Sequence, residues 1–554
     1  MIEIISGKYS PLHLLQITLS ESRVQALRRL SNLSRGYWGI MAAAACVAVY
    51  VTWASYYSIM RYAQYEATAF DLGIYLQGVW LISHGYYPFF DTVRGLPLFG
   101  DHATLILILV APLYRLYPRP EFLLFIQSVA LGSGGLATYG IAFWRLRNQG
   151  LALVLTIAYL LYAPVQWMNS WDFHPDVFAT PFLLFAILAL YRQRWVWFWI
   201  TLVCALASKE TVGLVVAAFG LYVGAVAGWR RGSGVVLLGL AWTYFTLNLI
   251  QYFDGGAPSP YIVALYGQYG RNLPSILGFI LTHPITTIHL LLNKQNVLYL
   301  GELLYPIAFL PFAAPELILI TIPALGINLL SRSPLTHFIQ YQYTASIVPF
   351  MMVGAIHGFG QCLEWCHSAP IKIRYLEWML GAILLLCSIY GCWTIGPWFS
   401  GKKTHGVAMS RSVTLELRRI PASACVSAQT ALVPILSQRR YIYAFPNPFL
   451  HKAWGSSINV FLHQEGAHAH LTSDQLALRF ARSKVDYIVL DPGSFLWPLV
   501  DSSQYRYVLR QLFRSRFYGI IYAKNGLIVL RRGANHQQGL ELLRRMRRND
   551  RLGF

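Results

Sequence analysis

Charged residues are scarce in this sequence: Asp, Glu, Lys and Arg together make up 12% of its 554 residues. Soluble globular proteins carry about 25% charged residues, so the composition excludes a chain made of ordinary soluble domains. Hydrophobic residues reach 56% and the mean hydropathy is +0.46, which also excludes intrinsic disorder. Much of the length lies in apolar runs long enough to cross a bilayer. The sequence therefore predicts a multi-pass membrane protein.

Acidic residues are rarer still: 23 Asp and Glu stand against 44 Lys and Arg, which gives a formal net charge of +21. In a soluble protein such an excess indicates a nucleic-acid partner. Here no nucleic-acid-binding motif accompanies the charge, and basic residues of membrane proteins mark cytoplasmic loops and contact anionic lipid headgroups. We therefore expect membrane lipid, and no nucleic acid, among the partners.

Motifs for metal and nucleotide binding are also missing. The sequence has seven cysteines, and the spacing of Cys362 and Cys366 matches no standard zinc pattern. It contains no Walker phosphate loop, no glycine-rich dinucleotide motif after a strand and no repeat of solenoid period. The cysteines are best explained as ordinary buried thiols.

The N-terminal part of the sequence predicts how the chain enters the membrane. Residues 1–36 are polar to amphipathic, carry four arginines and lack the features of a signal peptide, so we expect this segment in the cytoplasm. The first span is expected at 37–59. A large outer loop at 61–120 follows, with two half-apolar pieces, 69–84 and 103–117, that we expect to be interfacial or re-entrant.

Ten further apolar runs raise the expected number of transmembrane helices to about eleven within a transmembrane domain at 37–400. Arginine-rich loops at 145–147, 192–194 and 229–231 fall on one side under this alternation, as the positive-inside rule requires. Lysines flank the last span on both sides, so the positive-inside rule does not decide the orientation of this span by itself. The expected spans are 121–143, 151–166, 177–191, 195–208, 210–227, 234–251, 297–313, 316–330, 343–361 and 375–396.

The composition changes after residue 400. Residues 401–533 alternate short apolar strands with helical patterns at 474–483 and 502–515, and 517–531 reads as a hairpin with Asn525-Gly526 at its turn. We therefore expect an all-α polytopic membrane protein with a small C-terminal α/β domain. An odd number of crossings places this domain outside the cytoplasm. The basic tail at 534–554 is expected to be a solvated or headgroup-touching helix.

Ionisable groups at membrane depth are costly and are functional candidates by default. Two clusters of this kind lie in the large outer loop: Phe70-Asp71-Leu72-Gly73 and Gly100-Asp101-His102. Asp71 and Asp101 each have a simpler interpretation as helix N-caps. The other interpretation is acid–base chemistry at the outer membrane face.

Two further clusters come later in the chain. Asp172, His174 and Asp176 alternate over five residues, a spacing that suits divalent-metal ligation or acid–base chemistry. Lys209-Glu210 lies between two apolar runs at the expected outer edge. The simpler interpretation is a local ion pair or a snorkelling lysine. The functional interpretation is a cation at headgroup depth that holds a lipid-linked phosphate.

These motifs together resemble the GT-C superfamily of integral-membrane glycosyltransferases, which take sugars from polyprenyl-phosphate carriers. More closely, Phe-Asp-Leu-Gly-Ile-Tyr-Leu-Gln at 70–77, Gly-Asp-His at 100–102 and Phe-His-Pro-Asp at 173–176 look like an uncharacterised bacterial multi-pass membrane family placed in that superfamily. The resemblance covers roughly 37–400, and the C-terminal domain looks like part of the same family.

The resemblance implies roles for individual residues. Asp71 matches the catalytic acid of the first outer loop, and Asp101-His102 occupies the place of an acidic or His-Pro element. Asp172 or Asp176, with His174 between them, matches the acid that helps to hold metal or acceptor. Lys209, followed by Glu210, matches the lysine that holds the carrier phosphate. The first loop has no adjacent Asp-Glu or Asp-Asp pair, which leaves dependence on a divalent metal (Mg or Mn) open.

The implied function is transfer of a sugar from a polyprenyl-phosphate carrier to an extracytoplasmic glycan, lipid or protein acceptor at the cell membrane. Because a single base would activate the acceptor, we expect inversion at the anomeric carbon. A transporter or lipid flippase is the alternative, since Asp, His and Lys at membrane depth also suit proton relays. Against it, the polar residues lie at one membrane edge, and no inverted repeat is apparent. A sensor or scaffold is a third interpretation.

Overall fold

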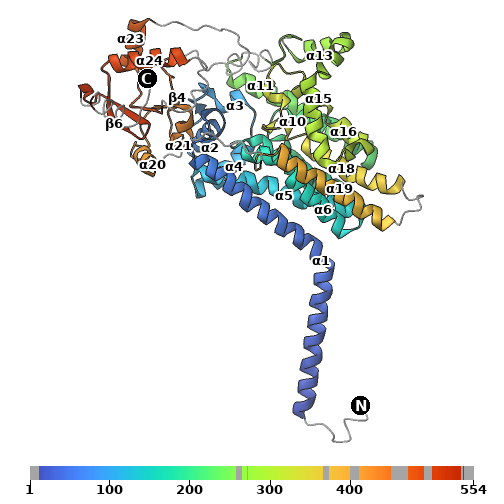
Figure 1. Ribbon diagram of the computed structural model, residues 1–554. Helices are drawn as coiled ribbons and strands as arrows, with labels where there is room; N and C mark the ends of the chain where they lie inside the picture. The colour runs from blue at the N-terminus through green and yellow to red at the C-terminus, as the bar shows by residue number, and fades with distance from the viewer. Residues whose placement is uncertain are drawn as a thin grey trace, which may run out of the picture.

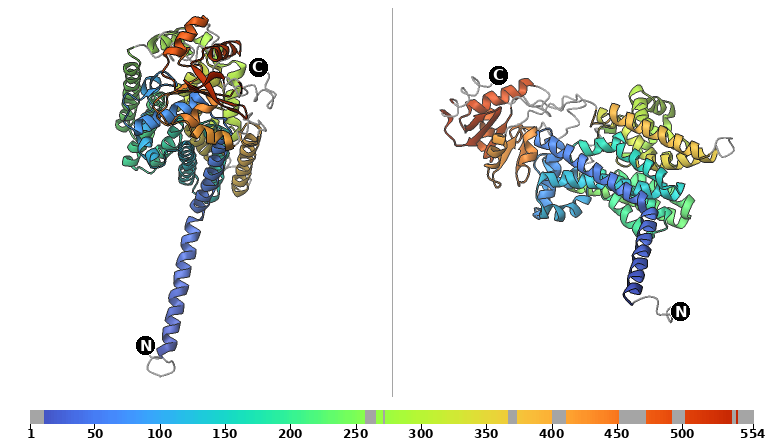
Figure 2. Two further views of the ribbon diagram at one scale, coloured as in Figure 1. Left: turned by 90° about the vertical axis from the view of Figure 1, so that its left-hand side faces the viewer. Right: turned by 60° about the horizontal axis from the view of Figure 1, so that its bottom comes forward.

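The computed structural model describes residues 11–256, 265–270, 272–365, 373–399, 411–450, 472–491, 502–537 and 541. Helices fill the part up to residue 399, and a smaller unit that contains a β-sheet follows it (Figure 1). We call residues 411–532 of this second part the sheet unit. Helix α1 (Pro11–Ala63) begins as a rod that projects from the helical part (Figure 2). Residues 1–10 and most of the expected basic tail lie outside the described residues.

The helical part follows the apolar runs of the sequence closely. In chain order its α-helices after α1 are α2 (Ile74–Ser83), α3 (Leu98–Asp101), α4 (Ile106–Leu116), α5 (Pro120–Leu146), α6 (Gln149–Leu161), α7 (Ala163–Ser170), α8 (Ala179–Tyr191), α9 (Trp195–Leu206), α10 (Val212–Ala227), α11 (Trp229–Phe253), α13 (Leu273–Thr282), α14 (Pro284–Leu291), α15 (Lys294–Leu304), α16 (Pro315–Ile320), α17 (Ile322–Leu329), α18 (Val348–Trp365) and α19 (Ile373–Thr394).

Short irregular helices and one small hairpin connect these elements. The π-helix η2 (Ala69–Gly73) precedes α2, and strands β1 (Phe90–Asp91) and β2 (Leu96–Pro97) pair antiparallel within the loop before α3. The 3-10 turns are η3 (Pro175–Phe178), η4 (Tyr305–Ile307), η5 (Leu310–Ala313), η6 (Pro334–His337) and η7 (Gln342–Thr344).

Fewer helices than expected are long enough to cross a membrane. In the described part of the chain, four helices meet the length and composition of a span, or up to six if each of two bent helix pairs counts as one. Helices α8, α9 and α10 are apolar but shorter. The expected spans at 297–313 and 316–330 are broken into short pieces, because prolines within them cannot donate the main-chain hydrogen bonds of a continuous helix. The expected count of eleven full spans is therefore not confirmed.

Prolines also explain the two bent pairs. Helices α6 and α7 meet at 44° with Pro164 in the first turn of α7, and α13 and α14 meet at 99° with Pro284 at the start of α14. Proline fits the first turn of a helix, where its missing N–H has no intrahelical partner. The bend between α6 and α7 directs α7 towards the loop at 171–174, which carries Asp172 and His174.

Glycines allow helices α10 and α11 to pack closely. A Cβ atom added at Gly232 would lie 2.4 Å from the Cα atom of Gly224, and one added at Gly239 would lie 2.5 Å from the backbone nitrogen of Ala217. Close approach of this kind through small residues is a common way for helices to associate in membranes, where burial of apolar surface supplies little driving force. The pair α10–α11 thus forms a rigid support beside Lys209, which directly precedes α10.

The sheet unit contains five strands: β3 (Val426–Ala428), β4 (Ile442–Ala444), β5 (Tyr487–Leu490), β6 (Tyr518–Lys524) and β7 (Leu527–Arg532). Their order is β4-β3-β5-β7-β6, with β3 parallel to both β4 and β5 and the remaining pairs antiparallel. The short runs of buried aliphatic residues in β3 and β5 are typical of strands covered on both faces. Helices α20 (Arg411–Arg418), α21 (Val433–Leu436), α23 (Ser473–Arg482) and α24 (Ser502–Arg514) accompany the sheet, with the 3-10 turn η9 (Thr430–Leu432).

The helices and the hairpin predicted for this part of the sequence are confirmed. Helices α23 and α24 lie within a residue or two of the predicted 474–483 and 502–515. Strands β6 and β7 pair through a turn at Asn525-Gly526, where both residues have positive φ angles of 53° and 78°. Such angles are those of the tight hairpin turn that an Asn-Gly pair favours.

Candidate active site

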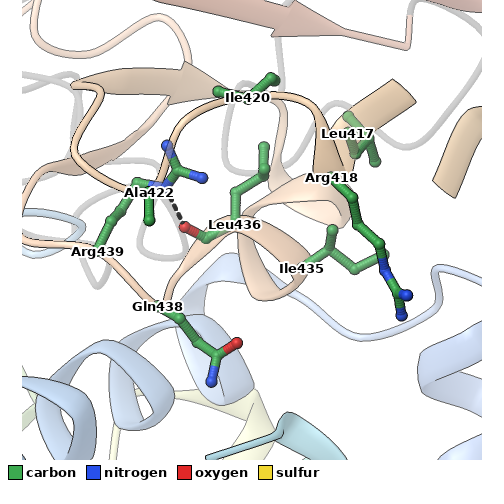
Figure 3. A pocket seen from close by; sticks show the side chains of 8 residues that line it. All are labelled: Leu417, Arg418, Ile420, Ala422, Ile435, Leu436, Gln438 and Arg439. Carbon is green, nitrogen blue, oxygen red and sulfur yellow. Dashed lines mark hydrogen bonds between the residues drawn. The ribbon is translucent and has the colours of Figure 1, made fainter. Parts of the chain in front are cut away.

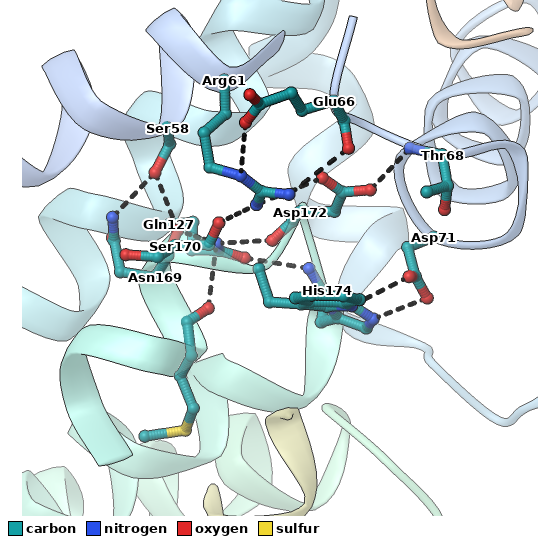
Figure 4. Close-up of polar contacts among 12 residues, drawn as sticks. Ser58, Arg61, Glu66, Thr68, Asp71, Gln127, Asn169, Ser170, Asp172 and His174 are labelled. Atoms are coloured by element: carbon teal, nitrogen blue, oxygen red, sulfur yellow. Dashed lines mark hydrogen bonds and ion pairs between the residues drawn. The ribbon is translucent and has the colours of Figure 1, made fainter. Parts of the chain in front are cut away.

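Asp71 lies in the middle of the π-helix η2 and faces the loop between α7 and η3. Its Oδ1 atom lies 3.0 Å from Nε2 of His174, and the indole nitrogen of Trp171 donates a hydrogen bond of 3.1 Å to its Oδ2 atom. Figure 4 shows the Asp71 carboxylate and the His174 imidazole side by side. The fold thus joins two of the predicted clusters, although about a hundred residues separate them.

The two side chains of the Asp71–His174 pair differ in solvent exposure. The Asp71 side chain is 25% exposed, whereas that of His174 is 1% exposed. Burial alone would raise the pKa of Asp71, but the imidazolium of His174, with its hydrogen bond, outweighs this and lowers it. Burial alone would lower the pKa of His174, and Asp71 reverses this and raises it. Both shifts favour the ionised pair over the neutral one.

Asp172 is held deeper, against the end of α1. Its Oδ2 atom accepts a hydrogen bond of 2.8 Å from the backbone N–H of Thr68, and its Oδ1 atom lies 3.7 Å from the guanidinium of Arg61. Arg61 also pairs with Glu66 at 3.4 Å and donates to the carbonyl oxygen of Ser170. Burial raises the pKa of Asp172 to about 6, although Arg61 opposes this shift. Asp172 has a φ of +23°, a backbone strain that these contacts hold in place.

Gln127 of α5 fixes the loop that carries Asp172 and His174. Its amide nitrogen donates hydrogen bonds to the carbonyl oxygens of Met168, Asn169 and Asp172, and its Oε1 atom accepts one of 2.9 Å from the N–H of His174. The side chain is fully buried. A buried amide whose donors and acceptor are all used is a strong constraint on the local backbone.

Lys209 pairs with the third acid of the predicted trio. Its ammonium lies 2.5 Å from Oδ2 of Asp176 and 5.9 Å from the centre of the Tyr343 ring. The side chains of Lys209 and Asp176 are both at most 10% exposed. The phenol of Tyr343 lies within electrostatic range of both Lys209 and Asp71. Burial would lower the pKa of Lys209, but Asp176 and Glu210 together raise it, so the ammonium stays charged.

One sequence interpretation paired Glu210 with Lys209. In the structure Glu210 has other hydrogen-bond partners. It accepts from the backbone N–H of Ala103 and lies 2.9 Å from Nδ1 of His102. Burial acts to raise the pKa of Glu210, but His102 and Lys209 lower it to about 2. The pair of His102 and Glu210 connects the predicted Asp-His cluster of the first loop to the turn that carries Lys209.

Asp101, predicted as a catalytic residue, makes a different contact. Its two carboxylate oxygens each lie 2.9 Å from a nitrogen of Arg94 in a bidentate pair, and both side chains are less than 10% exposed. A buried bidentate pair of this kind fixes the loop that contains β1 and β2. Asp101 therefore supports this loop, and Asp71 is the more exposed of the two acids. The catalytic role of Asp101 stays a prediction.

Asp172, His174 and Asp176, the candidates for a metal site, do not lie together as one ligand set. The three side chains have three different partners, Arg61, Asp71 and Lys209. In the described part of the chain, no group of three or more His, Cys, Asp or Glu side chains is placed to hold a metal ion. As placed here, these three side chains do not fit Mg or Mn.

Several residues around Asp71 were missed by the sequence analysis. They are Arg61, Gln127, Trp171, Tyr341 and Tyr343, of which the Trp171 and Tyr341 rings pack edge to face at 4.9 Å. Arg61 carried a signal, because an arginine at the outer end of a span runs against the positive-inside rule. Tyr341 and Tyr343 carried none, since they stand at the start of an apolar run.

A small pocket lies apart from these charged pairs, in the sheet unit (Figure 3). Its wall includes Arg439, whose guanidinium donates to the carbonyl oxygens of Leu436, Pro421 and Ala424. These bonds stay within the sheet unit, so Arg439 is a structural part of the pocket wall. The candidate reaction site is the group of charged side chains around Asp71, and this pocket is not part of it. The other lining residues are Leu417, Arg418, Ile420, Ala422, Ile435, Leu436 and Gln438.

Apolar helices of spanning length, together with buried ion pairs among them, define a membrane protein. The chain belongs to the family described as "Predicted membrane protein (DUF2079)", whose family model matches residues 61–529. The resemblance to an uncharacterised membrane family is thereby confirmed. No curated protein matches the sequence significantly. Among solved structures, ArnT from Cupriavidus metallidurans in the apo state is similar at 13% identity and a TM-score of 0.46. That match covers 83% of this chain and 93% of the other.

Proposed function

We propose that this protein is a glycosyltransferase that moves a sugar from a polyprenyl-phosphate carrier to an acceptor hydroxyl at the extracytoplasmic face. The observation that carries the proposal is the position of Asp71: it is ion-paired with a buried histidine, yet a quarter of its side chain is exposed. Asp172 and Asp176 are at most 5% exposed, so Asp71 is the carboxylate of this cluster that a substrate can reach. The motif resemblance at 70–77 and 173–176 supports the same assignment.

The contacts of Asp71 suit a general base. The acceptor hydroxyl attacks the anomeric carbon, the bond from that carbon to the phosphate oxygen breaks, and its electron pair leaves with the carrier phosphate. The hydroxyl proton passes to Asp71. His174 and Trp171 hold the carboxylate in one orientation, which is what an acceptor needs for in-line attack. One base acting once predicts inversion at the anomeric carbon.

Lys209 is the proposed partner of the carrier phosphate. Its ammonium has three N–H donors, and Asp176 uses one of them, which orients the others. The buried surroundings strengthen the attraction between this cation and the negative charge that grows on the leaving phosphate. The Tyr343 ring lies 5.9 Å from the Lys209 ammonium, beside the proposed phosphate position.

The positions of the basic loops support the extracytoplasmic side. The Arg231 guanidinium lies 4.0 Å from the centre of the Trp195 ring, so the loops at 192–194 and 228–231 are neighbours. Lys209 follows the other end of α9, away from these arginines. If the basic loops face the cytoplasm, as the positive-inside rule requires, the cluster around Asp71 and Lys209 faces the opposite side.

Purified protein in liposomes, with radiolabelled sugar on a polyprenyl phosphate, tests the proposal. Asp71→Asn keeps size and hydrogen bonding but removes the base, so transfer should fall by about 10²–10⁴-fold while carrier binding stays near wild type. Lys209→Ala should weaken carrier binding and transfer together. Asp254→Asn, an acid outside the described ion pairs, serves as the matched control and should behave like wild type.

Two results would overturn the proposal. If Asp71→Asn transferred sugar at the wild-type rate, Asp71 would not be the general base. Movement of labelled solute or carrier across the liposome membrane without transfer would favour the transporter or flippase instead.

A further inference from the structure

The sheet unit touches the π-helix that carries Asp71. The backbone N–H of Ala69, the first residue of η2, donates a hydrogen bond of 3.3 Å to the side-chain hydroxyl of Thr430. Thr430 begins η9, directly after strand β3, and is 3% exposed. On the other side of η2, a Cβ atom added at Gly73 would lie 2.9 Å from Cγ1 of Val433. Both ends of the five-residue π-helix therefore meet the sheet unit.

The hydrogen bond to Thr430 satisfies a donor that the helix itself leaves open. The first N–H groups of a helix have no intrahelical acceptor, and a buried one costs stability unless a side chain accepts it. At the start of η2 two such groups follow each other: the N–H of the N-cap Thr68 donates to Asp172, and the N–H of Ala69 donates to Thr430. The backbone two residues before Asp71 is thus fixed from the helical part and from the sheet unit at once.

Further buried bonds hold the same two parts together. The hydroxyl of Thr92 donates to the carbonyl oxygen of Ile442 and accepts from the N–H of the same residue, on the edge strand β4. Gln77, one turn along the helix that continues η2, donates to the carbonyl oxygens of Arg439 and Arg440. These bonds limit how far the sheet unit can shift against η2, so Thr430 has a fixed position relative to Asp71.

We propose that Thr430 is a positioning residue for Asp71: its hydroxyl anchors the start of η2 and so places the Asp71 carboxylate against His174. The kinetic consequence rests on the function proposed above, whereas the structural consequence does not. Nothing in the sequence marks Thr430, because it lies 361 residues from Ala69 and in another part of the chain.

Kinetics in the liposome assay form the first arm of the test. Thr430→Val removes the hydroxyl at nearly constant volume and should lower kcat by at least about 10-fold with an unchanged KM for the carrier, because small shifts of a base are costly. Thr430→Ala removes the same hydroxyl without adding a methyl group and should agree. Thr430→Ser keeps the acceptor and should restore kcat. Gln438→Leu breaks bonds from the sheet unit to Tyr114 and Pro118, neither of which belongs to η2, and should leave kcat unchanged.

The titration of His174 forms the second arm and needs no activity. It is followed by NMR of ¹⁵N-histidine-labelled protein in detergent, with the signal assigned by its loss in His174→Gln. Since Asp71 raises the pKa of His174, a displaced Asp71 in Thr430→Val should shift the titration to lower pH, and Thr430→Ser should not.

The two arms separate the proposals. An unchanged His174 titration in both Thr430→Val and Thr430→Ala would overturn the positioning role. A shifted titration in a protein whose wild type transfers no sugar would keep the positioning role and refute the proposed function.

Discussion

Gln127 offers the clearest test of how the loop at 168–174 is held. Gln127→Met keeps the length of the side chain but removes its polar atoms. The carbonyl of Asn169 keeps the hydroxyl of Ser58 as a donor at 2.8 Å. The carbonyl of Met168 loses a bond of 3.2 Å, and the carbonyl of Asp172 and the N–H of His174 each lose a bond of 2.9 Å. An unsatisfied buried group costs about 1–3 kcal/mol, so three of them predict a loss of roughly 3–9 kcal/mol.

A second variant and a neighbour sharpen this prediction. Gln127→Glu places carboxylate oxygens against carbonyl oxygens and should destabilise more than Gln127→Met, because it adds repulsion to the lost bonds. Ser128→Ala, next to it and equally buried, removes only a bond of 3.0 Å to Leu124 within the same helix. Such back-bonds contribute little to helix stability, so this control should change stability by less than about 1 kcal/mol.

Thermal unfolding in detergent micelles measures the three variants side by side. The expected order of melting temperatures is Ser128→Ala highest, then Gln127→Met, then Gln127→Glu. Equal melting temperatures for all three would refute the reasoning, since the hydrogen bonds of Gln127 would then contribute nothing measurable.

Two further predictions concern pH and topology. The Asp71–His174 pair should stabilise wild type over His174→Gln most between about pH 4 and 6.5. The contribution of His174 to stability is complete below its ordinary pKa of 6.5 and is lost as the pH rises through its raised pKa. The contribution of Asp71 to stability is complete above its ordinary pKa of 3.8 and is lost as the pH falls through its lowered pKa. Melting temperatures across pH 4–9 check this, and a gap that widens above pH 7 would contradict it. In a cysteine-free background, Arg419→Cys, whose parent side chain is 78% exposed, should react with an impermeant maleimide on intact cells, whereas Arg194→Cys should react only after permeabilisation. The reverse result would place the cluster around Asp71 in the cytoplasm.

The sequence predicts which charged residues come together better than which of them pair. Asp71, Asp172, His174, Asp176 and Lys209 were all identified from motifs, and the fold places four of them in two ion pairs. Their partners could not be assigned, because the bonds from Asp176, Asp71 and Asp172 to Lys209, His174 and Thr68 join residues at least 33 positions apart. Sequence neighbours suggested Lys209 with Glu210, but adjacent side chains in a turn or helix point in different directions.

The same limit applies to the fold. Long apolar runs with few prolines, such as α5, were predicted to within a few residues at each end. The runs at 297–313 and 316–330 were misjudged because hydropathy counts proline as part of an apolar run, whereas proline interrupts the helix. The anchor of η2 at Thr430 could not be predicted, since its only sequence signal is a threonine after a short strand.

The contact between η2 and the sheet unit also sets an order of assembly. Ala69 and Thr430 are 361 residues apart, and Thr92 and Ile442 are 350 apart. At about 5–20 residues per second, the ribosome needs roughly 20–70 seconds to reach Thr430 after it has made Ala69. During that time the N–H of Ala69 lacks the hydrogen-bond partner that it has in the folded chain. The segment that bears Asp71 therefore reaches its final packing only when the last quarter of the polypeptide has been synthesised and folded against it.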